Sequence, residues 1–437
     1  MKSSFQTILI GVFIAAFILA VFVFSGIIKL GSSGGASTVV GSVSVWGTYP
    51  KNLVQSYIDQ LNIENKNISI SYTEKTSSSI QQDLVGALAE GLQPDILITN
   101  SEDFFSIKNR VYTIPFATYP ERTFRDSFVD GTSLFLEKDG VLAVPLLVDP
   151  LVVYYNKDLL AGQNYVVPPT TWTGLVQALP FFMKKDTRGV ISQTTLPFGE
   201  SSNVDHFKEI LATLFLQTGN PIVARNQTTG GYDTTLINGS ASDEGTQNAI
   251  AEALTFFTSF SNPTSQAFSW TRTLPDGLDM FLSGRSAFYI GRASELFTIQ
   301  SKNPNLNFDV TAMFQPDNAV RPITYGSFSS LAVVKATKNF TAAYTVAGQL
   351  TSKEFIEYIS AGLSLPPARR DLLLAQQKNP YVQVFFKSAL SAFSWTDIDP
   401  RSSERIFRDM IQGVSSGKVN AAQAIYEASR DLQSSLR

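Results

Sequence analysis

The hydrophobic and polar positions in the first part of the chain repeat with two different periods. Apolar residues occur at about every second position in residues 43–46 and 68–72, and at every third or fourth position in residues 52–61 and 80–92. A period of two is typical of half-buried strands, and a period near 3.6 is typical of amphipathic helices. A third apolar run, at residues 94–99, follows the second helix. The pattern therefore predicts strands and helices in alternation, as in a parallel α/β sheet wound on both faces.

Polar and aromatic residues follow two of these predicted strands. The first strand ends in Trp46, Thr48 and Tyr49 come directly after it, and Asn100 follows the third strand. Ligands of open α/β sheets bind outside the carboxyl ends of the strands. We therefore expect these side chains near a binding site, although Trp46 could equally be a core residue at a strand end.

Asp149 interrupts a long hydrophobic segment. Residues 144–148 read as one buried strand and residues 151–155 as another, and an Asn-Lys-Asp turn then leads into a helix. An unpaired carboxylate buried between such strands would be costly. Asp149 is therefore expected to point into a polar cleft.

The segment around Asp149 resembles the point where the chain first crosses between two lobes in extracellular solute-binding proteins of ABC transporters, of the maltodextrin-binding type. Further motifs of that family occur on both sides of this segment, in the order that the family has them: Gly91-Leu92-Gln93-Pro94-Asp95-Ile96, Pro168-Pro169-Thr170-Thr171-Trp172, the helix-to-strand segment 280–291, Tyr325-Gly326-Ser327, residues 361–367 and the closing helix from Ser416. The resemblance covers the chain from Val43 to its C-terminus.

This resemblance implies an α/β fold of the periplasmic-binding-protein-like type II, with two lobes that each contain a central, mostly parallel sheet flanked by helices. Lobe 1 would comprise residues 43–148 and 328–363, and lobe 2 would comprise residues 149–327 and 364–437. Three crossing segments would join the lobes and let them close on a ligand.

The resemblance also implies which residues bind the ligand: Trp46, Thr48, Tyr49, Asn100, Asp149, Glu200, Arg292 and Tyr325. A sugar offers hydroxyl groups and CH patches, which polar side chains and aromatic faces bind. Each assignment has an alternative: Glu200 could cap a helix and Arg292 could face solvent. Tyr325 could pack in a hinge.

The N-terminal segment is almost entirely apolar. Residues 8–28 contain Ser25 as their only polar side chain. Twenty-one residues in a helix span roughly 30 Å, the thickness of the hydrocarbon core of a bilayer. We expect a single-pass transmembrane anchor at 1–29, followed by a flexible Gly/Ser linker at 30–42, with the remainder of the chain outside the cell membrane. A cleaved signal peptide is the alternative, but no convincing small-x-small cleavage site follows.

Composition excludes several kinds of chemistry. The 437 residues carry a net charge of only -3, which gives no electrostatic footprint for nucleic acid. The chain has no cysteine, which excludes disulfides and thiolate metal sites. His206 is its only histidine and is expected to lie near the start of a helix, at the surface or at a packing edge. No cofactor and no metal site are expected, nor is a catalytic residue.

We therefore expect a monomeric, membrane-anchored protein that binds a small polar solute, most plausibly an oligosaccharide, and is not an enzyme. The resemblance implies an ABC permease and its ATPase subunits as partners. Alternatives are an anchored hydrolase that acts on glycans, a sensor that signals through its membrane helix, and a binding protein for polyamine or ferric ion. Paired tyrosines, such as Tyr154 and Tyr155, bind ferric ion in relatives, but neighbours in a strand point to opposite faces.

Overall fold

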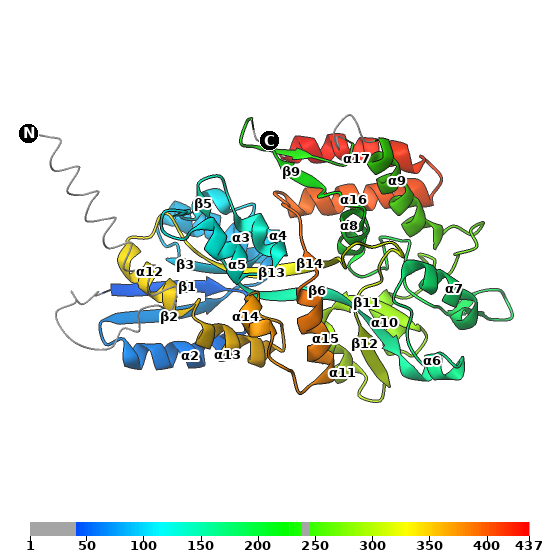
Figure 1. The fold of residues 1–437 in the computed structure, drawn as a ribbon, viewed down its shortest axis with the longest axis horizontal. Helices are drawn as coiled ribbons and strands as arrows, with labels where there is room; N and C mark the ends of the chain where they lie inside the picture. Colours follow the sequence, from blue (N-terminus) through cyan, green and yellow to red (C-terminus); the bar gives the residue numbers. More distant parts are fainter. Residues whose placement is uncertain (1–40, 227, 238–243, 437) are drawn as a thin grey trace, which may run out of the picture. The chain divides into compact units, whose positions relative to one another are not determined.

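The computed structural model describes residues 41–226, 228–237 and 244–436 (Figure 1). The predicted anchor, with its span at residues 8–28, lies outside the described residues. The predicted linker also lies outside them, except that residues 41 and 42 belong to the first strand. Within the described ranges, no helix has the length and apolar character needed to cross a membrane.

The chain divides into two compact units. The first contains the described residues up to Leu147, with Phe328–Leu363 and Pro367–Leu372, and the second contains Val148–Ser327, Ser364–Pro366 and Leu373–Arg437. Two long strands, β6 (Val144–Asn156) and β13 (Thr324–Val333), therefore begin in one unit and end in the other.

The first unit confirms the predicted alternation of strands and helices. Strand β1 (Gly41–Gly47) pairs in parallel with both β2 (Ile68–Glu74) and β3 (Ile96–Asn100), and β13 joins β3 in the antiparallel direction. The remaining elements are α2 (Lys51–Glu64), α3 (Ser77–Glu90), α4 (Ser101–Phe104), η1 (Lys108–Arg110), β4 (Ile114–Pro115), α5 (Glu121–Ser127), η2 (Asp130–Phe135), β5 (Gly140–Val141), α12 (Phe340–Gln349), α13 (Lys353–Leu363) and α14 (Arg370–Leu373), whose last residue belongs to the second unit.

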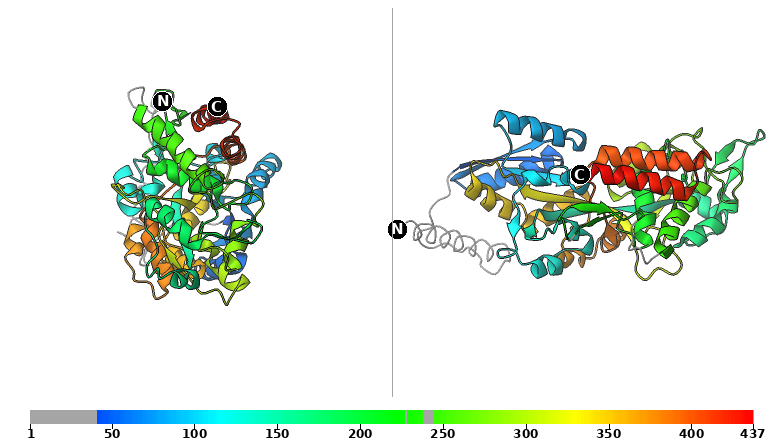
Figure 2. Two further views of the ribbon diagram at one scale, coloured as in Figure 1. Left: turned by 90° about the vertical axis from the view of Figure 1, so that its right-hand side faces the viewer. Right: turned by 90° about the horizontal axis from the view of Figure 1, so that it is seen from above.

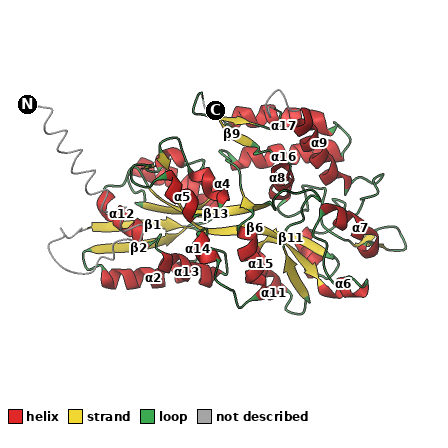
Figure 3. Ribbon diagram, in the orientation of Figure 1, coloured by secondary structure: helices red, strands yellow, loops and turns green. Residues whose placement is uncertain are grey.

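Helices cover both faces of this sheet. In Figures 1 and 3, α2 and α13 lie along one side of the strands, and α3 and α5 lie along the other. Helix α3 buries Ile80 and Leu84 in a cluster with Leu97 of β3. Helices α2 and α13 meet through an edge-to-face contact between Tyr57 and Phe355, whose ring centroids are 5.0 Å apart. Apolar residues at helical spacing therefore position the strand ends of this unit.

The second unit is richer in helices. Its elements are the end of β6, α6 (Lys157–Gly162), α7 (Trp172–Phe182), β7 (Lys184–Lys185), β8 (Ile191–Gln193), α8 (Phe207–Gln217), β9 (Val223–Arg225), β10 (Tyr232–Thr234), α9 (Glu244–Ser259), α10 (Gly277–Leu282), β11 (Phe288–Arg292), η3 (Ala293–Glu295), α11 (Leu296–Lys302), β12 (Phe308–Thr311), the start of β13, α15 (Pro380–Ala389), β14 (Ala392–Phe393), α16 (Pro400–Ser415) and α17 (Ala421–Ser435).

The mostly parallel sheet predicted for this second lobe is wrong in its strand directions. Tyr154 of β6 pairs with Tyr289 of β11 and with Val310 of β12, so β6 lies between these two strands. Both pairings are antiparallel. The alternation of strands and helices specifies the order of elements along the chain, but it does not specify whether a strand of opposite direction is inserted between two others.

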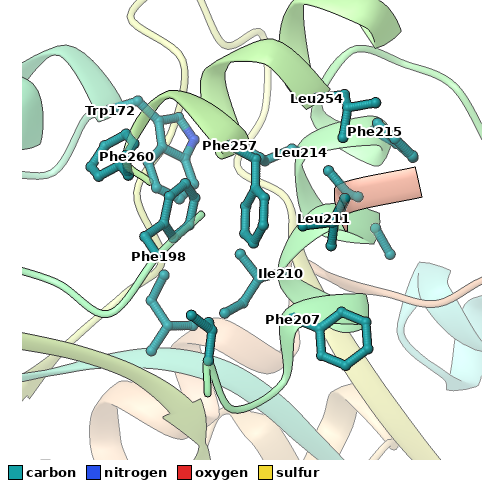
Figure 4. Packing of buried hydrophobic residues seen from close by; sticks show 14 of the residues in the cluster. Trp172, Phe198, Phe207, Ile210, Leu211, Leu214, Phe215, Leu254, Phe257 and Phe260 are labelled. Carbon is teal, nitrogen blue, oxygen red and sulfur yellow. The ribbon is translucent and has the colours of Figure 1, made fainter. Parts of the chain in front are cut away.

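A large aromatic core holds the helices of the second unit. Figure 4 shows Phe198, Phe257 and Phe260 gathered beside Trp172, with Ile210 and Leu211 of α8 packed nearby. The centroids of Phe198 and Phe257 are 4.5 Å apart. Helices α16 and α17 lie side by side in Figures 1 and 2 and contribute residues such as Phe407 and Ile425 to the same core. This packing fixes the first turn of α8, which carries part of the candidate site.

Candidate functional site

The first unit places two uncharged polar side chains at neighbouring strand ends. Thr48 follows β1, and Asn100 is the last residue of β3, which is the parallel neighbour of β1. Both residues are half-buried, and within the described part of the chain neither side chain makes a hydrogen bond. Their hydroxyl and amide groups are therefore able to bind a polar ligand.

Trp46 and Tyr49 are held by the fold. The ammonium group of Lys75 lies 4.2 Å from the centroid of Trp46, which is partly buried against the α3 cluster. Tyr49 is buried, its hydroxyl is hydrogen-bonded to Ser329, and its carbonyl oxygen accepts a hydrogen bond from the Tyr72 hydroxyl at 2.7 Å. Burial raises the pKa of Tyr49, so this hydroxyl stays protonated. Tyr49 is thus positioned as a packing residue.

The second unit brings Asp149 and Arg292 together with residues of α8, β11 and η3. We call this group the Asp149 cluster; its members are Asp149 of β6, His206 and Glu209 at the start of α8, Tyr289 and Arg292 of β11, and Ser294 and Glu295 of η3. Five of the seven side chains carry charge or titrate near neutral pH.

Asp149 receives two hydrogen bonds from one residue. The Ser294 amide donates to its Oδ1 at 3.0 Å, and the Ser294 hydroxyl donates to its Oδ2 at 2.6 Å. Ser294 is exposed and Asp149 is half-buried, so this pair lies at the surface of the unit. A carboxylate has about four lone-pair positions, which leaves capacity for the hydroxyl groups of a ligand.

Ion pairs hold the rest of the Asp149 cluster. The Arg292 guanidinium donates to Glu209 Oε1 at 3.0 Å, and His206 Nε2 lies 2.6 Å from Glu295 Oε1. The Tyr289 hydroxyl donates to Glu295 Oε2 at 3.0 Å. The Arg292 guanidinium is therefore not a simple surface group, because the Glu209 carboxylate already accepts a hydrogen bond from it.

The pKa values of Asp149 and Glu209 are shifted in opposite directions, because burial dominates at Asp149 and nearby positive charge dominates at Glu209. Burial raises the pKa of Asp149, and Arg292 and the two Ser294 hydrogen bonds only partly oppose this. Burial also disfavours ionisation of Glu209, but the charges of Arg292, His206 and Lys208 outweigh it and lower its pKa to about 2. Glu209 is thus an anion at neutral pH, and Asp149 is the more easily protonated carboxyl group.

Glu200 and Tyr325 lie elsewhere in the second unit. Glu200 is buried, and one oxygen lies 3.4 Å from a guanidinium nitrogen of Arg272. Burial raises the pKa of Glu200, and Arg272 opposes this rise. Tyr325 is buried in the core of the unit, where its backbone amide donates to the Thr213 hydroxyl at 3.1 Å.

Four members of the Asp149 cluster were missed by the sequence analysis: Glu209, Tyr289, Ser294 and Glu295. Each lies two or three residues from a residue that the sequence did single out, either His206 or Arg292. The signal that could have pointed to these residues was His206, the only histidine of the chain, near the start of a predicted helix. His206 lies half-buried at the N-cap of α8, as expected, but it is bound to Glu295.

In the described part of the chain, the Asp149 cluster offers hydrogen-bonding groups, and its histidine and serine are each bound to a carboxyl group. His206 contacts a carboxylate and no hydroxyl nucleophile, and the Ser294 hydroxyl is engaged by Asp149. Among the described residues, no group of three or more His, Asp or Glu side chains could hold a metal ion.

Comparisons with known proteins agree with this description. Residues 56–385 match the family model described as bacterial extracellular solute-binding protein. No curated protein sequence matches the chain.

Solved structures share the fold. A cyclo/maltodextrin-binding protein in complex with maltotetraose has a TM-score of 0.72 at 17% identity, covering 92% of this chain and 98% of its own. A cyclic alpha-maltosyl-1,6-maltose binding protein from Arthrobacter globiformis also has a TM-score of 0.72, at 16% identity, with 91% and 99% covered. The sugar-binding protein MalE from Xanthomonas citri has the same score at 15% identity, with 91% and 97% covered.

Proposed function

Because the chain belongs to the family of bacterial extracellular solute-binding proteins, we propose that it captures a carbohydrate outside the cytoplasm and delivers it to an ABC importer. The observation that carries the proposal is the agreement over nine-tenths of the chain with sugar-binding proteins such as the one solved with maltotetraose. The partners in this proposal are a permease and its ATPase subunits, and the protein itself performs no chemistry.

The candidate residues suit a ligand rich in hydroxyl groups. Asp149 supplies a carboxylate acceptor, while Thr48 and Asn100 supply groups that both donate and accept hydrogen bonds. Trp46 adds an aromatic face for CH patches of a sugar ring. In this proposal the two units act as lobes that a solute stabilises in a closed state, because a ligand shifts such an equilibrium only through contacts that are better in that state.

Membrane attachment through residues 8–28 is a further part of the proposal. It is supported by the apolar composition of that segment alone. The test is fractionation of cells that produce either the full chain or a chain without residues 1–40. We expect the first in the membrane fraction and the second in the soluble fraction. Recovery of both in the soluble fraction would contradict the anchor.

The solute is tested by a thermal-shift screen of the full-length chain, in a detergent without a sugar head group. The screen includes malto- and manno-oligosaccharides, with spermidine and ferric ion as non-sugar arms. A solute at a hundred times its dissociation constant should stabilise the protein by about 2.7 kcal/mol. Stabilisation by spermidine or ferric ion alone would replace the carbohydrate in the proposal.

A hydrolase is distinguished by the substitution Asp149→Asn. A binding protein keeps its fold and loses affinity, and it releases no product from the bound sugar. A glycan-acting hydrolase would instead lose turnover with binding largely retained, because glycoside hydrolysis needs a pair of carboxyl groups. Product release by the unsubstituted protein, followed by chromatography, would refute the non-enzymatic function.

A further inference from the structure

The short helix η3 is held from several sides. Asp149 of β6 receives both hydrogen bonds of Ser294, and Glu295 contacts His206 and Tyr289. The backbone carbonyl of Arg292, which precedes the helix, accepts a hydrogen bond from the Tyr154 hydroxyl at 2.8 Å. Adjacent residues of one three-residue helix thus connect Asp149 on one side to His206 on the other.

His206 occupies a position that the backbone makes unusual. It is the N-cap of α8 and has φ 56° and ψ 26°, the left-handed conformation that few residues other than glycine adopt. This conformation and the first turn of α8 hold the imidazole at its 2.6 Å contact with Glu295. The only histidine of the chain is therefore fixed in place at the Asp149 cluster.

The charge around the imidazole is predominantly negative. The titratable and charged groups that face it or adjoin it are Glu295 of η3, Asp205 and Glu209 on either side of the start of α8, Lys208 of α8, Tyr289 and Arg292 of β11, and Asp149 and Tyr154 of β6. Lys208 is itself paired with Asp397 at 2.8 Å. Glu295, Glu209 and Asp205 therefore place negative charge beside the imidazole, Arg292 opposes them, and a proton on His206 reduces the excess.

We propose that His206 is a positioning residue, whose proton holds Glu295 and with it the Ser294 turn, so that protonation of His206 is coupled to solute binding at Asp149. This inference rests on the proposed function for the identity of the bound solute. Loss of the proton removes the positive charge beside Glu295 and weakens one of the contacts that hold the turn, although the hydroxyl groups of Tyr289 and Tyr154 still bind it.

The direction of the pH dependence follows from the contacts. Burial lowers the pKa of His206, but the hydrogen bond and charge of Glu295, with the charge of Glu209, leave it above 6.5. The stabilising interaction is therefore fully present below pH 6.5 and is lost as the pH rises through the folded-state pKa. Affinity for solute should fall over the same interval, by about fivefold for a coupling at the lower end of the usual range.

The single histidine makes the titration directly measurable. The full-length chain, labelled with 13C-histidine and prepared without a histidine tag, gives one imidazole signal in NMR spectra. We expect this signal to titrate above pH 6.5 in the absence of solute. By reciprocity, a fivefold coupling raises the imidazole pKa by about 0.7 on binding of maltotetraose. An imidazole that titrates at or below 6.5 would overturn the proposal.

Two variants of His206 separate the effect of its positive charge from the effect of its place in the fold, and a variant of Ser294 tests the link to Asp149. Asparagine tolerates the left-handed conformation and cannot carry the proton, so His206→Asn should bind maltotetraose with the weaker affinity at every pH. His206→Lys keeps a positive charge throughout and should retain the stronger affinity at high pH. Ser294→Ala should keep the imidazole titration and lose its coupling to affinity. An unchanged pH dependence in His206→Asn would refute the proposal.

A solute-free measurement keeps this inference separate from the proposed function. Asp149→Asn removes one negative charge and replaces the oxygen that accepts the Ser294 hydroxyl, so it should lower the imidazole pKa of His206. If maltotetraose and the other sugars bind at no pH, the carbohydrate function fails, while this measurement still decides the coupling. An imidazole titration unaffected by Asp149→Asn would contradict the coupling whatever the protein binds.

Discussion

The two units hold their candidate residues in different ways. In the first unit the candidates are uncharged, and Thr48 and Asn100 stand at strand ends that apolar packing positions. In the second unit Asp149 and Arg292 belong to a connected set of ion pairs and hydrogen bonds. Apolar packing thus positions Thr48 and Asn100 in the first unit, whereas ion pairs and hydrogen bonds position Asp149 and Arg292 in the second.

This difference has a consequence for sensitivity to conditions. Apolar packing responds little to pH or salt, whereas ion pairs depend on protonation and, when exposed, on ionic strength. Groups held in advance also lose less conformational freedom when a ligand binds. The second unit should therefore contribute the more directional and more pH-sensitive part of recognition, and the first unit the part that tolerates change.

The largest expected effect is on stability. Lys208→Met in the second unit removes the ammonium group that lies 2.8 Å from the buried carboxylate of Asp397, which should reduce the free energy of unfolding by about 3–5 kcal/mol. Lys75→Met is the control in the first unit, because the Lys75–Asp83 pair is partly exposed and should contribute at most about 1 kcal/mol. Urea denaturation measures both. If both variants lost the same free energy of unfolding, the proposed difference between the two units would be wrong.

Acid should affect the units unequally. The pKa of Glu209 is lowered to about 2, so its contribution is present above the unfolded value near 4.5 and is lost as the pH falls through about 2. The shift corresponds to about 3 kcal/mol. Asp371 in the first unit also has a pKa of about 2, since Arg369 and Lys353 outweigh its burial, but its side chain is 40% exposed.

Solvent screening should therefore reduce the contribution of Asp371 to about 1 kcal/mol or less. Unfolding of Glu209→Gln and Asp371→Asn is measured at pH 7 and pH 2.5, each in low and in high salt. We expect the deficit of Glu209→Gln to shrink at pH 2.5 and to change little with salt. A salt-sensitive deficit of similar size in both variants would show that exposure does not separate the two carboxylates.

Affinity should be more sensitive in the second unit than in the first. Asp149→Asn replaces a charged acceptor and should weaken solute binding by about 1.5–3 kcal/mol, roughly 10- to 150-fold. Calorimetric titration at pH 6 measures this change. The asparagine keeps the size of the side chain, so retained affinity would exclude Asp149 as a ligand-binding residue.

The sequence anticipated the elements of the first unit better than the charges of the second. Periodicity predicted residues 68–72 as a strand because alternate burial is a local property, and the structure has β2 at Ile68–Glu74. The pairing of His206 with Glu295 joins residues 89 positions apart through α8 and η3. Such a pairing depends on how helices and strands pack, and no local pattern encodes it.

The same limit applies to the inserted strand β6. Its apolar run predicted burial, but its antiparallel direction between β11 and β12 depends on the path of the whole unit. Tyr49 illustrates the reverse case: its place after a strand suggested a ligand contact, and the packed tyrosine is bonded to Ser329 instead. The neighbours of Tyr49 in the sequence do not indicate that its ring is buried.

The smallest expected effect concerns Thr48. Its hydroxyl makes no hydrogen bond within the described residues, so Thr48→Ala removes nothing that the folded chain uses and should leave the free energy of unfolding within about 0.5 kcal/mol. If the hydroxyl binds solute, affinity should fall by about 0.5–1.5 kcal/mol, the usual net value of a neutral hydrogen bond. Thr48→Ser, which keeps the hydroxyl, is the matched control and should retain affinity. Calorimetry on the three proteins decides the point, because a loss in both variants would indicate that the methyl group is what the ligand contacts. Unchanged affinity in both would remove Thr48 from the site and leave Asn100 as the uncharged polar group that the first unit offers at these strand ends.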